Sequence, residues 1–215
     1  MRRERRYAGR VGFYDDRVVP HLVHLACGMS ALTPLRQRAC APLSGRMLEV
    51  GFGSGLNVGL YPDTITEVAA VEPSDVGWRM AADRVAESSV PIERSGLDGQ
   101  KLPFEDDSFD AALSTFTLCT IPDLRAALTE IRRVLRPGGT LGFLEHGLAP
   151  DEKVRRWQHR LEPIQKRLVG GCHLTRDVRA ELTAAGFTLG SVDSFYQPGV
   201  PKPHGALSLG TAVPA

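Results

Sequence analysis

A regular alternation of strand-like and helix-like segments, beginning near residue 46, constrains the fold more than any other feature of this sequence. Short apolar runs alternate with amphipathic runs that end at Pro or Gly. Strands separated by helices favour a parallel sheet covered on both faces. We therefore predict strands at 47–51, 65–72, 90–94, 109–116 and 140–145, and helices at 56–61, 75–87 (capped by Ser74) and 124–135.

The last third of the sequence departs from this alternation. A helix rich in Arg and Gln is predicted over 152–168, and Thr175 can cap a further helix over 176–185. Two final strands, 188–196 and 206–212, are joined by a Pro-rich segment that is too short for a crossover helix. We therefore expect them to form an antiparallel hairpin.

The length of 215 residues suits one domain. We predict a helical cap over residues 1–40 and a main domain over 41–215, with a helical insertion at 148–174. Ordinary apolar content (42%) and charged content (24%) exclude a disordered chain. The net charge of +1 provides no field for a polyanion, so no nucleic-acid partner is expected. Oligomeric state is not readable.

The cysteines indicate a reduced, cytoplasmic protein, and the basic N-terminus is not expected to be a signal peptide or a membrane span. Residues 1–10 carry five arginines, but no apolar run follows that could act as a signal peptide or an integral membrane segment. Cys27, Cys40, Cys119 and Cys172 form no Cys-x-x-Cys pair and have no Cys/His spacing of a zinc site, so no metal is predicted. We interpret Cys119 and Cys172 as inert packing residues.

A glycine cluster follows the first predicted strand. Gly51, Gly53 and Gly55 would let the backbone turn sharply and let a ligand approach closely. Glu72 ends the second strand, where an acid can bind a ribose diol. These features fit NAD as well, although Leu56 stands where the dinucleotide pattern has its third glycine.

Acidic residues around the loop discriminate between cofactors. Glu49, Glu72 and Asp98 should converge on one cleft. They would repel a pyrophosphate, but they suit a cofactor that carries an ammonium, a sulfonium and a ribose, because Coulomb attraction strengthens away from bulk water. S-adenosyl-L-methionine is such a cofactor. For Glu49 an equally good alternative is a structural carboxylate that bonds nearby loop amides.

Four successive motifs resemble those of class I S-adenosylmethionine-dependent methyltransferases. They are LEVGFGSG at 48–55, VEP at 71–73, LPFEDDSFD at 102–110 and EIRRVLRPGG at 130–139. The resemblance implies a Rossmann-like α/β fold with a seven-stranded sheet of order 3-2-1-4-5-7-6, in which strand 7 is antiparallel. It also implies that methyl transfer converts the cofactor to S-adenosyl-L-homocysteine.

Roles for individual residues follow from their positions in these motifs. The resemblance implies that the glycine loop lies under the methionyl part, that Glu72 binds the ribose hydroxyls and that Asp98 binds the adenine amine. The predicted cofactor-binding set is Glu49, Gly51, Gly53, Gly55, Asn57, Glu72, Pro73, Asp98, Gly99, Thr115 and Leu118.

Further segments resemble a narrower group, the methyltransferase-like enzymes that methylate small alkyl thiols and hydrogen sulfide. They are TLCT at 117–120, LEH at 144–146, the Trp157 helix, LEP at 161–163 and GCHLTRD at 171–177. This resemblance implies S-methylation of a small-molecule thiol. Quinone and phospholipid methyltransferases share the general motifs, so a C-, O- or N-methyltransferase for a quinone-like, phenolic or amine metabolite is the alternative. A nicotinamide-dependent oxidoreductase is a third.

Histidines and aromatic residues are the candidates for the acceptor side. His146 ends the fifth strand, where the carboxyl ends of parallel strands face the ligand crevice, so it is the predicted catalytic residue that orients or deprotonates the acceptor. The alternative is a strand-end histidine bonded to backbone. Predicted substrate-binding residues are Phe13, Tyr14, Trp157 and His173. For the aromatic residues the alternative is ordinary core packing. For His173 the alternative is a capping role at the residues that precede a helix.

Overall fold

A seven-stranded sheet forms the centre of the computed structural model, which describes residues 17–215. The strand order is β3-β2-β1-β4-β5-β7-β6, and β7 runs antiparallel to both β5 and β6. This confirms the predicted fold class and the terminal hairpin. The strands are β1 Gly45–Val50, β2 Ile65–Val71, β3 Ile92–Gly96, β4 Phe109–Thr115, β5 Leu135–His146, β6 Phe187–Tyr196 and β7 Ala206–Pro214.

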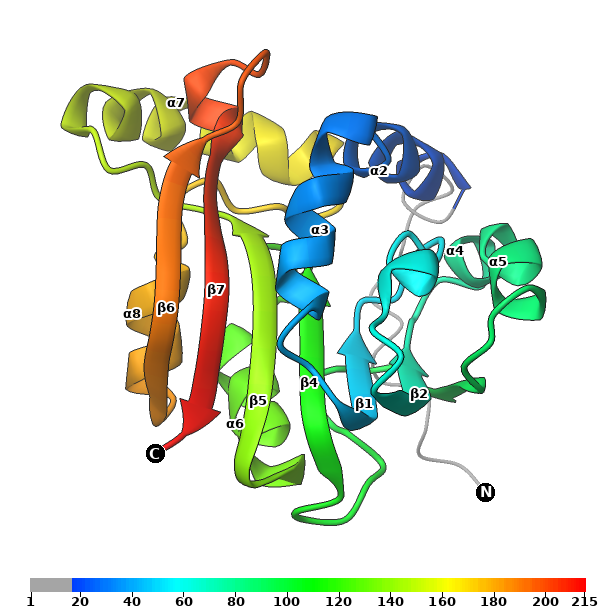
Figure 1. Cartoon of the computed structure of the whole chain (residues 1–215). Coiled ribbons are helices and arrows are strands. Elements are labelled where there is room, and N and C mark those ends of the chain that lie inside the picture. The colour runs from blue at the N-terminus through cyan, green and yellow to red at the C-terminus, as the bar shows by residue number, and fades with distance from the viewer. Residues whose placement is uncertain (1–16) are drawn as a thin grey trace, which may run out of the picture.

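Helices cover both faces of the sheet (Figure 1). One face carries α6 and α8, whose apolar residues join the core cluster around Phe109 and Phe143. The other face carries α3, which packs with Met47 and Leu144 in a second cluster. Near the carboxyl ends of β4 and β5, the sheet is flanked by α2 and α7 (Figure 1). The helix bounds are α2 Val19–Cys27, α3 Thr33–Cys40, α4 Asp75–Met80, α5 Ala82–Ala86, α6 Leu124–Val134, α7 Glu152–Leu168, α8 Val178–Ala184 and α9 Lys202–Gly205.

Three local predictions were wrong. The segment 56–61 forms only a 3₁₀ turn at Val58–Leu60, consistent with the low helix propensity of its glycine and with the proline that follows. The helix at 75–87 is divided into α4 and α5, although Ser74 caps it as predicted. The cap of α8 is Asp177 and not Thr175; its carboxylate accepts from the Ala180 N–H.

The fifth strand is longer than predicted. It begins at Leu135, which pairs with Phe109, and includes the Pro137–Gly139 segment that we expected to separate the helix from the strand. A register shift between Phe109 and Ala111 accommodates this segment. Within residues 17–215, none of the helices has the length and apolar character that crossing a membrane requires.

Candidate cofactor and acceptor site

The glycine loop lies at the carboxyl end of β1. Gly51, Gly53 and Gly55 all have positive φ angles, of 76°, 58° and 72°, which L side chains rarely adopt. A Cβ at Gly51 would also lie 2.0 Å from Oγ1 of Thr117, so this glycine permits close packing of the loop that follows β4. At Gly53 a Cβ would meet nothing nearer than 4.0 Å. Gly53 therefore faces open space, where a ligand can approach the backbone.

Glu72 ties the end of β2 to the glycine loop. Its Oε2 accepts from the Gly53 N–H at 2.6 Å and its Oε1 accepts from the Ser74 N–H at 2.7 Å. Burial raises the pKa of Glu72, and the two backbone hydrogen bonds oppose that shift. The carboxylate thus fixes the loop conformation and places a negative charge beside the open face of Gly53.

Glu49 belongs to a buried network. Asn57 Nδ2 donates to its Oε1 at 2.9 Å and the Tyr61 hydroxyl donates to its Oε2 at 2.5 Å. Burial raises the pKa of Glu49 to about 7, although these hydrogen bonds and the charge of Arg36 lower it. Both oxygens have protein partners, which favours the structural alternative for Glu49. Asn57 also donates to Thr115 Oγ1 at 2.9 Å.

Arg36 is a member of this network that no feature of the sequence singles out. It is only 5% exposed, and its Nη1 donates to Asn57 Oδ1 at 2.9 Å and to Thr115 Oγ1 at 2.7 Å. Its Nη2 donates to the Cys27 carbonyl at 3.1 Å. Arg36 therefore joins α3 and the end of α2 to the glycine-loop region, and no local signal distinguishes it from the exposed Arg38.

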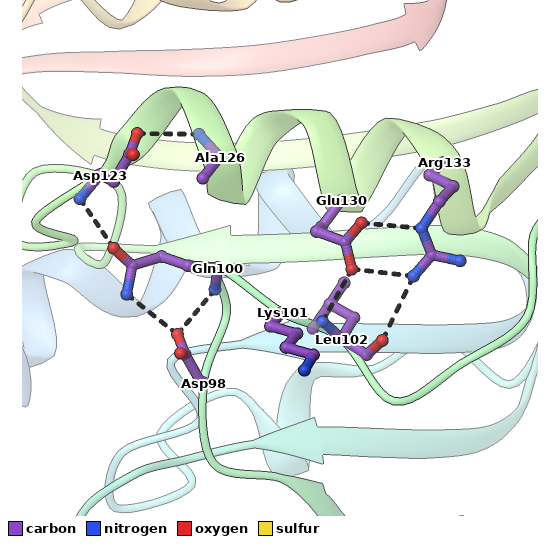
Figure 2. Close-up of a pocket in the computed structure, with 8 residues that line it drawn as sticks. All are labelled: Asp98, Gln100, Lys101, Leu102, Asp123, Ala126, Glu130 and Arg133. Atoms are coloured by element: carbon purple, nitrogen blue, oxygen red, sulfur yellow. Dashed lines mark hydrogen bonds and ion pairs between the residues drawn. The ribbon is translucent and has the colours of Figure 1, made fainter. Parts of the chain in front are cut away.

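Asp98 lies at the rim of a polar hollow of about 520 Å³ between the β3–β4 connection and α6 (Figure 2). Its Oδ1 accepts from the backbone N–H and the side-chain Nε2 of Gln100, at 2.9 and 3.0 Å. The hollow contains no residue of the glycine loop, so we do not assign it to the cofactor. Gly99, in contrast, approaches that loop, because its Cβ would lie 3.0 Å from Val50 at the end of β1.

The remaining predicted cofactor residues have mixed environments. Thr115 is buried at the end of β4 within the Arg36 network. The side chain of Leu118 is fully buried in the core, and its carbonyl accepts from Arg176 Nη1 at 2.5 Å. Pro73 follows Glu72 and is exposed. Leu118 can therefore face a ligand only through its backbone.

His146 lies at the carboxyl end of β5, as predicted, and is 6% exposed. Its Nε2 lies 3.3 Å from the Pro203 carbonyl, and its Nδ1 lies 3.7 Å from Cys172 Sγ. Cys172 Sγ is also 3.7 Å from Cys119 Sγ. The hydrogen bond between the thiols and the nearby imidazole lower the pKa of Cys172, while that hydrogen bond and burial raise the pKa of Cys119. The structure thus joins two cysteines interpreted as inert to the predicted catalytic histidine.

Glu145 is a third buried acid, after Glu49 and Glu72, and it was not predicted from the sequence, although it lies beside His146 in the LEH motif. Its Oε1 accepts from Ser114 Oγ at 2.7 Å and from the Thr117 N–H at 3.1 Å, and its Oε2 accepts from the Cys119 N–H at 3.4 Å. Burial raises its pKa to about 7. Glu145 therefore holds the loop after β4 against β5.

Two of the predicted substrate-binding residues, Trp157 and His173, lie in the described part of the chain and have different surroundings. Trp157 is 56% exposed on α7 and packs against the Arg160 guanidinium. His173 Nδ1 lies 3.0 Å from Glu162 Oε1, and burial together with Arg176 lowers the pKa of His173. Phe13 and Tyr14 lie outside the described residues.

The sheet order, the positive-φ glycine loop and the acid at the end of β2 define a Rossmann-like protein that binds an adenosyl cofactor. The family model described as a methyltransferase domain matches residues 48–143. Rat (Rattus norvegicus) thiol S-methyltransferase TMT1B is 34% identical over 175 residues, covering 78% of this chain and 70% of the relative. The human (Homo sapiens) protein of that name is 35% identical over 148 residues, covering 66% and 59%.

Two further comparisons concern a curated relative with a different name and a solved structure with the same fold. The demethylmenaquinone methyltransferase of Roseiflexus castenholzii is 33% identical over 150 residues, covering 61% of this chain and 57% of its own. A Thermotoga maritima structure, described as a SAM-dependent methyltransferase and possible histamine N-methyltransferase, has a TM-score of 0.64 at 23% identity and covers 91% and 94% of the two chains. The chain belongs to the class I S-adenosylmethionine-dependent methyltransferases and resembles their thiol S-methyltransferase group.

Proposed function

We propose that this methyltransferase transfers the methyl group of S-adenosyl-L-methionine to the thiol sulfur of a small molecule and releases S-adenosyl-L-homocysteine. The observation that carries the thiol assignment is the length of the match to the rat thiol S-methyltransferase. The alignment of 175 residues is much longer than the methyltransferase domain match at 48–143, so it includes segments on one or both sides of that domain match. The match to the demethylmenaquinone methyltransferase covers less of the chain.

The residues of this chain suit S-adenosylmethionine. The open face of Gly53 lets the methionyl part approach the backbone, and Glu72 supplies a carboxylate whose oxygens can accept further bonds from ribose hydroxyls. Gly99, three residues after β3, approaches Val50 at the end of β1, so Gly99 and its neighbour Asp98 are the proposed contacts to the adenine. Glu49 acts indirectly in this proposal, because Asn57 and Tyr61 occupy its oxygens.

Methyl transfer from a sulfonium requires little acid–base catalysis by the protein. The sulfonium carries an activated methyl group, so the protein must place the acceptor in line at about 3 Å and exclude water. A free thiol has a pKa of about 8.5, so only a few per cent is the reactive thiolate near neutrality. His146 is the proposed residue that orients the acceptor or raises this fraction, and its Nδ1 side, beside Cys172, is the side through which it can act.

Elements outside the central sheet would enclose the acceptor. We propose that residues 1–40 and 148–174 form its cover, since α2 and α7 flank the end of the sheet where β4 and β5 terminate (Figure 1). His173 contributes to this cover through its contact with Glu162, which joins the segment after α7 to α7 itself.

Two measurements test the proposal. Isothermal titration should show binding of S-adenosylhomocysteine and none of NAD; the opposite result would refute the cofactor assignment. A radiolabelled methyl-transfer screen should then show turnover of alkyl thiols in preference to phenols, quinols and amines of similar size. Turnover of an amine, phenol or quinol, with every thiol inactive, would refute the thiol assignment and leave the methyltransferase assignment intact.

A further inference from the structure

Three potential metal ligands meet at the carboxyl end of the sheet. Cys119 comes from the loop after β4, His146 from the end of β5, and Cys172 from the segment after α7. Their ligand atoms all lie within 4.8 Å of one another, and all three side chains are buried. Buried sulfur and imidazole ligands are the set that zinc prefers, whereas magnesium and calcium take oxygen ligands.

Two of the three distances between the ligand atoms match those of a tetrahedral zinc site, and the third pair lies within 4.8 Å. With Zn–S bonds of about 2.3 Å and Zn–N bonds of about 2.0 Å, two sulfurs on one ion lie about 3.8 Å apart and a sulfur–nitrogen pair about 3.5 Å apart. The Cys119 Sγ to Cys172 Sγ distance is 3.7 Å, and the Cys172 Sγ to His146 Nδ1 distance is 3.7 Å. A disulfide would require a bond of about 2.05 Å, so the two thiols are free here.

The second nitrogen of the histidine is arranged as in known metal sites. A carbonyl can only accept a hydrogen bond, so the contact of His146 Nε2 with the Pro203 carbonyl at 3.3 Å places the ring proton on Nε2. The lone pair of Nδ1 then points toward Cys172. Histidines that bind metals almost always donate their other ring N–H to a carbonyl, carboxylate or water, which fixes the tautomer.

Neighbouring groups fix the positions of the two cysteines. Glu145 accepts from the Cys119 N–H at 3.4 Å, and the Cys119 carbonyl accepts from the His173 N–H at 2.8 Å. The second contact joins the Cys172 segment to the loop after β4. The two thiols are therefore brought together by backbone contacts that do not depend on an ion.

We propose that Cys119, His146 and Cys172 bind one zinc-class divalent cation. Two thiolates and a neutral imidazole balance its charge, so the buried site carries no net charge. Within residues 17–215 no fourth His, Cys, Asp or Glu belongs to the group, so the last tetrahedral position is left to a ligand from solution. Three protein ligands with one open position are the pattern of catalytic zinc sites, and structural sites are closed by four.

The position of the site connects it with the methyl acceptor, a step that rests on the proposed function. Cys119 lies two residues after Thr117, and the Thr117 hydroxyl donates to the Gly51 carbonyl of the glycine loop at 3.4 Å. A thiol acceptor that takes the open position loses its proton to solvent, because a coordinating thiol is deprotonated. His146 then raises the thiolate fraction as a ligand of the cation and not as a base. Its sulfur then forms the new S–CH₃ bond while the sulfonium C–S bond breaks, which yields a thioether and S-adenosylhomocysteine.

The experiment is a zinc competition titration with a chromophoric chelator under reducing conditions. Wild-type protein should withdraw one zinc ion per chain, and Cys172→Ser and His146→Ala should bind about 100-fold or more weakly. Cys40→Ser is the matched control, because Cys40 is equally buried but lies in α3, outside the group, and its affinity should equal that of wild type. Circular dichroism should show that each variant is folded.

The visible absorption of Co²⁺ bound to wild-type protein is an independent test of the site. Co²⁺ should produce thiolate charge-transfer absorption and the intense visible bands of tetrahedral coordination, and both should be lost in Cys119→Ser. Zinc affinity that is equal in wild type and Cys172→Ser, or a cobalt spectrum without thiolate bands, would overturn the site. Zinc binding without turnover of any thiol would refute the proposed function and leave the site standing. Full thiol turnover after removal of zinc would refute its catalytic role.

Discussion

The cofactor side and the acceptor side of this molecule are built from contacts of different range along the chain. Around the glycine loop, Glu49 is bonded by residues 8 and 12 positions away, and Glu72 bonds an amide 19 positions away. Around His146 the partners are 26 and 57 positions away, and the two cysteines are 53 apart. Residues that contact one another over a short range appear in the sequence as a recognisable motif, whereas residues that contact one another over a long range are scattered along it. The cofactor could therefore be read from the sequence more directly than the acceptor.

Arg36 breaks this rule on the cofactor side and should give the largest effect. We expect Arg36→Ala to lower the free energy of unfolding by about 3 kcal/mol, because it removes three hydrogen bonds, two of them buried, and leaves Asn57 Oδ1 without its donor. Arg38→Ala is the matched control in the same helix. Its ion pair with Asp193 is half exposed, so its loss should cost no more than about 1 kcal/mol. Equal losses in chemical denaturation would contradict the role of Arg36.

Glu72 tests whether the short-range network serves the cofactor. We expect Glu72→Ala to weaken S-adenosylhomocysteine binding by on the order of 100-fold. The backbone N–H groups of Gly53 and Ser74 lose their charge-assisted hydrogen bonds, and the ribose hydroxyls lose the carboxylate that would bind them. Glu72→Gln should retain part of the affinity. Calorimetry on variants that circular dichroism shows to be folded is the measurement, and an unchanged affinity in Glu72→Ala would exclude Glu72 from the site.

The pH dependence of stability allows Glu49 on the cofactor side to be compared with Glu145 on the acceptor side, since burial raises the pKa of both to about 7. Between about pH 4.5 and 7 the folded state holds protons that the unfolded state has released. The contribution of each acid to stability should therefore be present at low pH and be lost as pH rises through this window. Relative to Glu49→Gln, wild type should lose about 1 to 3 kcal/mol across it.

The measurement is urea denaturation of wild type and Glu49→Gln at several pH values. Taking the difference between the two proteins removes the opposing contributions of His173 and His204, whose lowered pKa values favour the folded state as pH rises. Glu145→Gln should behave in the same way on the acceptor side. A difference that stays constant from pH 4.5 to 7 would mean that Glu49 is ionised throughout.

Trp157 should give the smallest effect. Its side chain is largely exposed on α7, so Trp157→Ala should change stability by no more than about 0.5 kcal/mol and the KM for a thiol by less than about twofold. Steady-state kinetics across thiols of increasing size are the check. A KM that rises steeply for the larger thiols would place Trp157 over the acceptor and support the predicted substrate-binding role.

Sequence reasoning recovered the sheet order through motif resemblance, and the terminal hairpin also through the length of the last connection. It placed the positive-φ glycines and the acid at the end of β2, because turn chemistry and strand ends are local properties. It failed at 56–61, where apolar spacing predicted a helix and the backbone forms one 3₁₀ turn. It also began β5 five residues too late, since pairing with β4 carries the strand through a Pro-Gly-Gly segment.

The sequence by itself determined that this chain forms a doubly wound sheet with a glycine loop and an acid at its carboxyl edge, because strand period, helix spacing and glycine conformation act over a few residues. Only the tertiary structure decided that Arg36 is buried against Asn57, and that Cys119, His146 and Cys172 meet. The physical reason is that burial and ligand geometry depend on which distant segments the sheet brings to one edge. Spacing along the chain carries no record of that proximity.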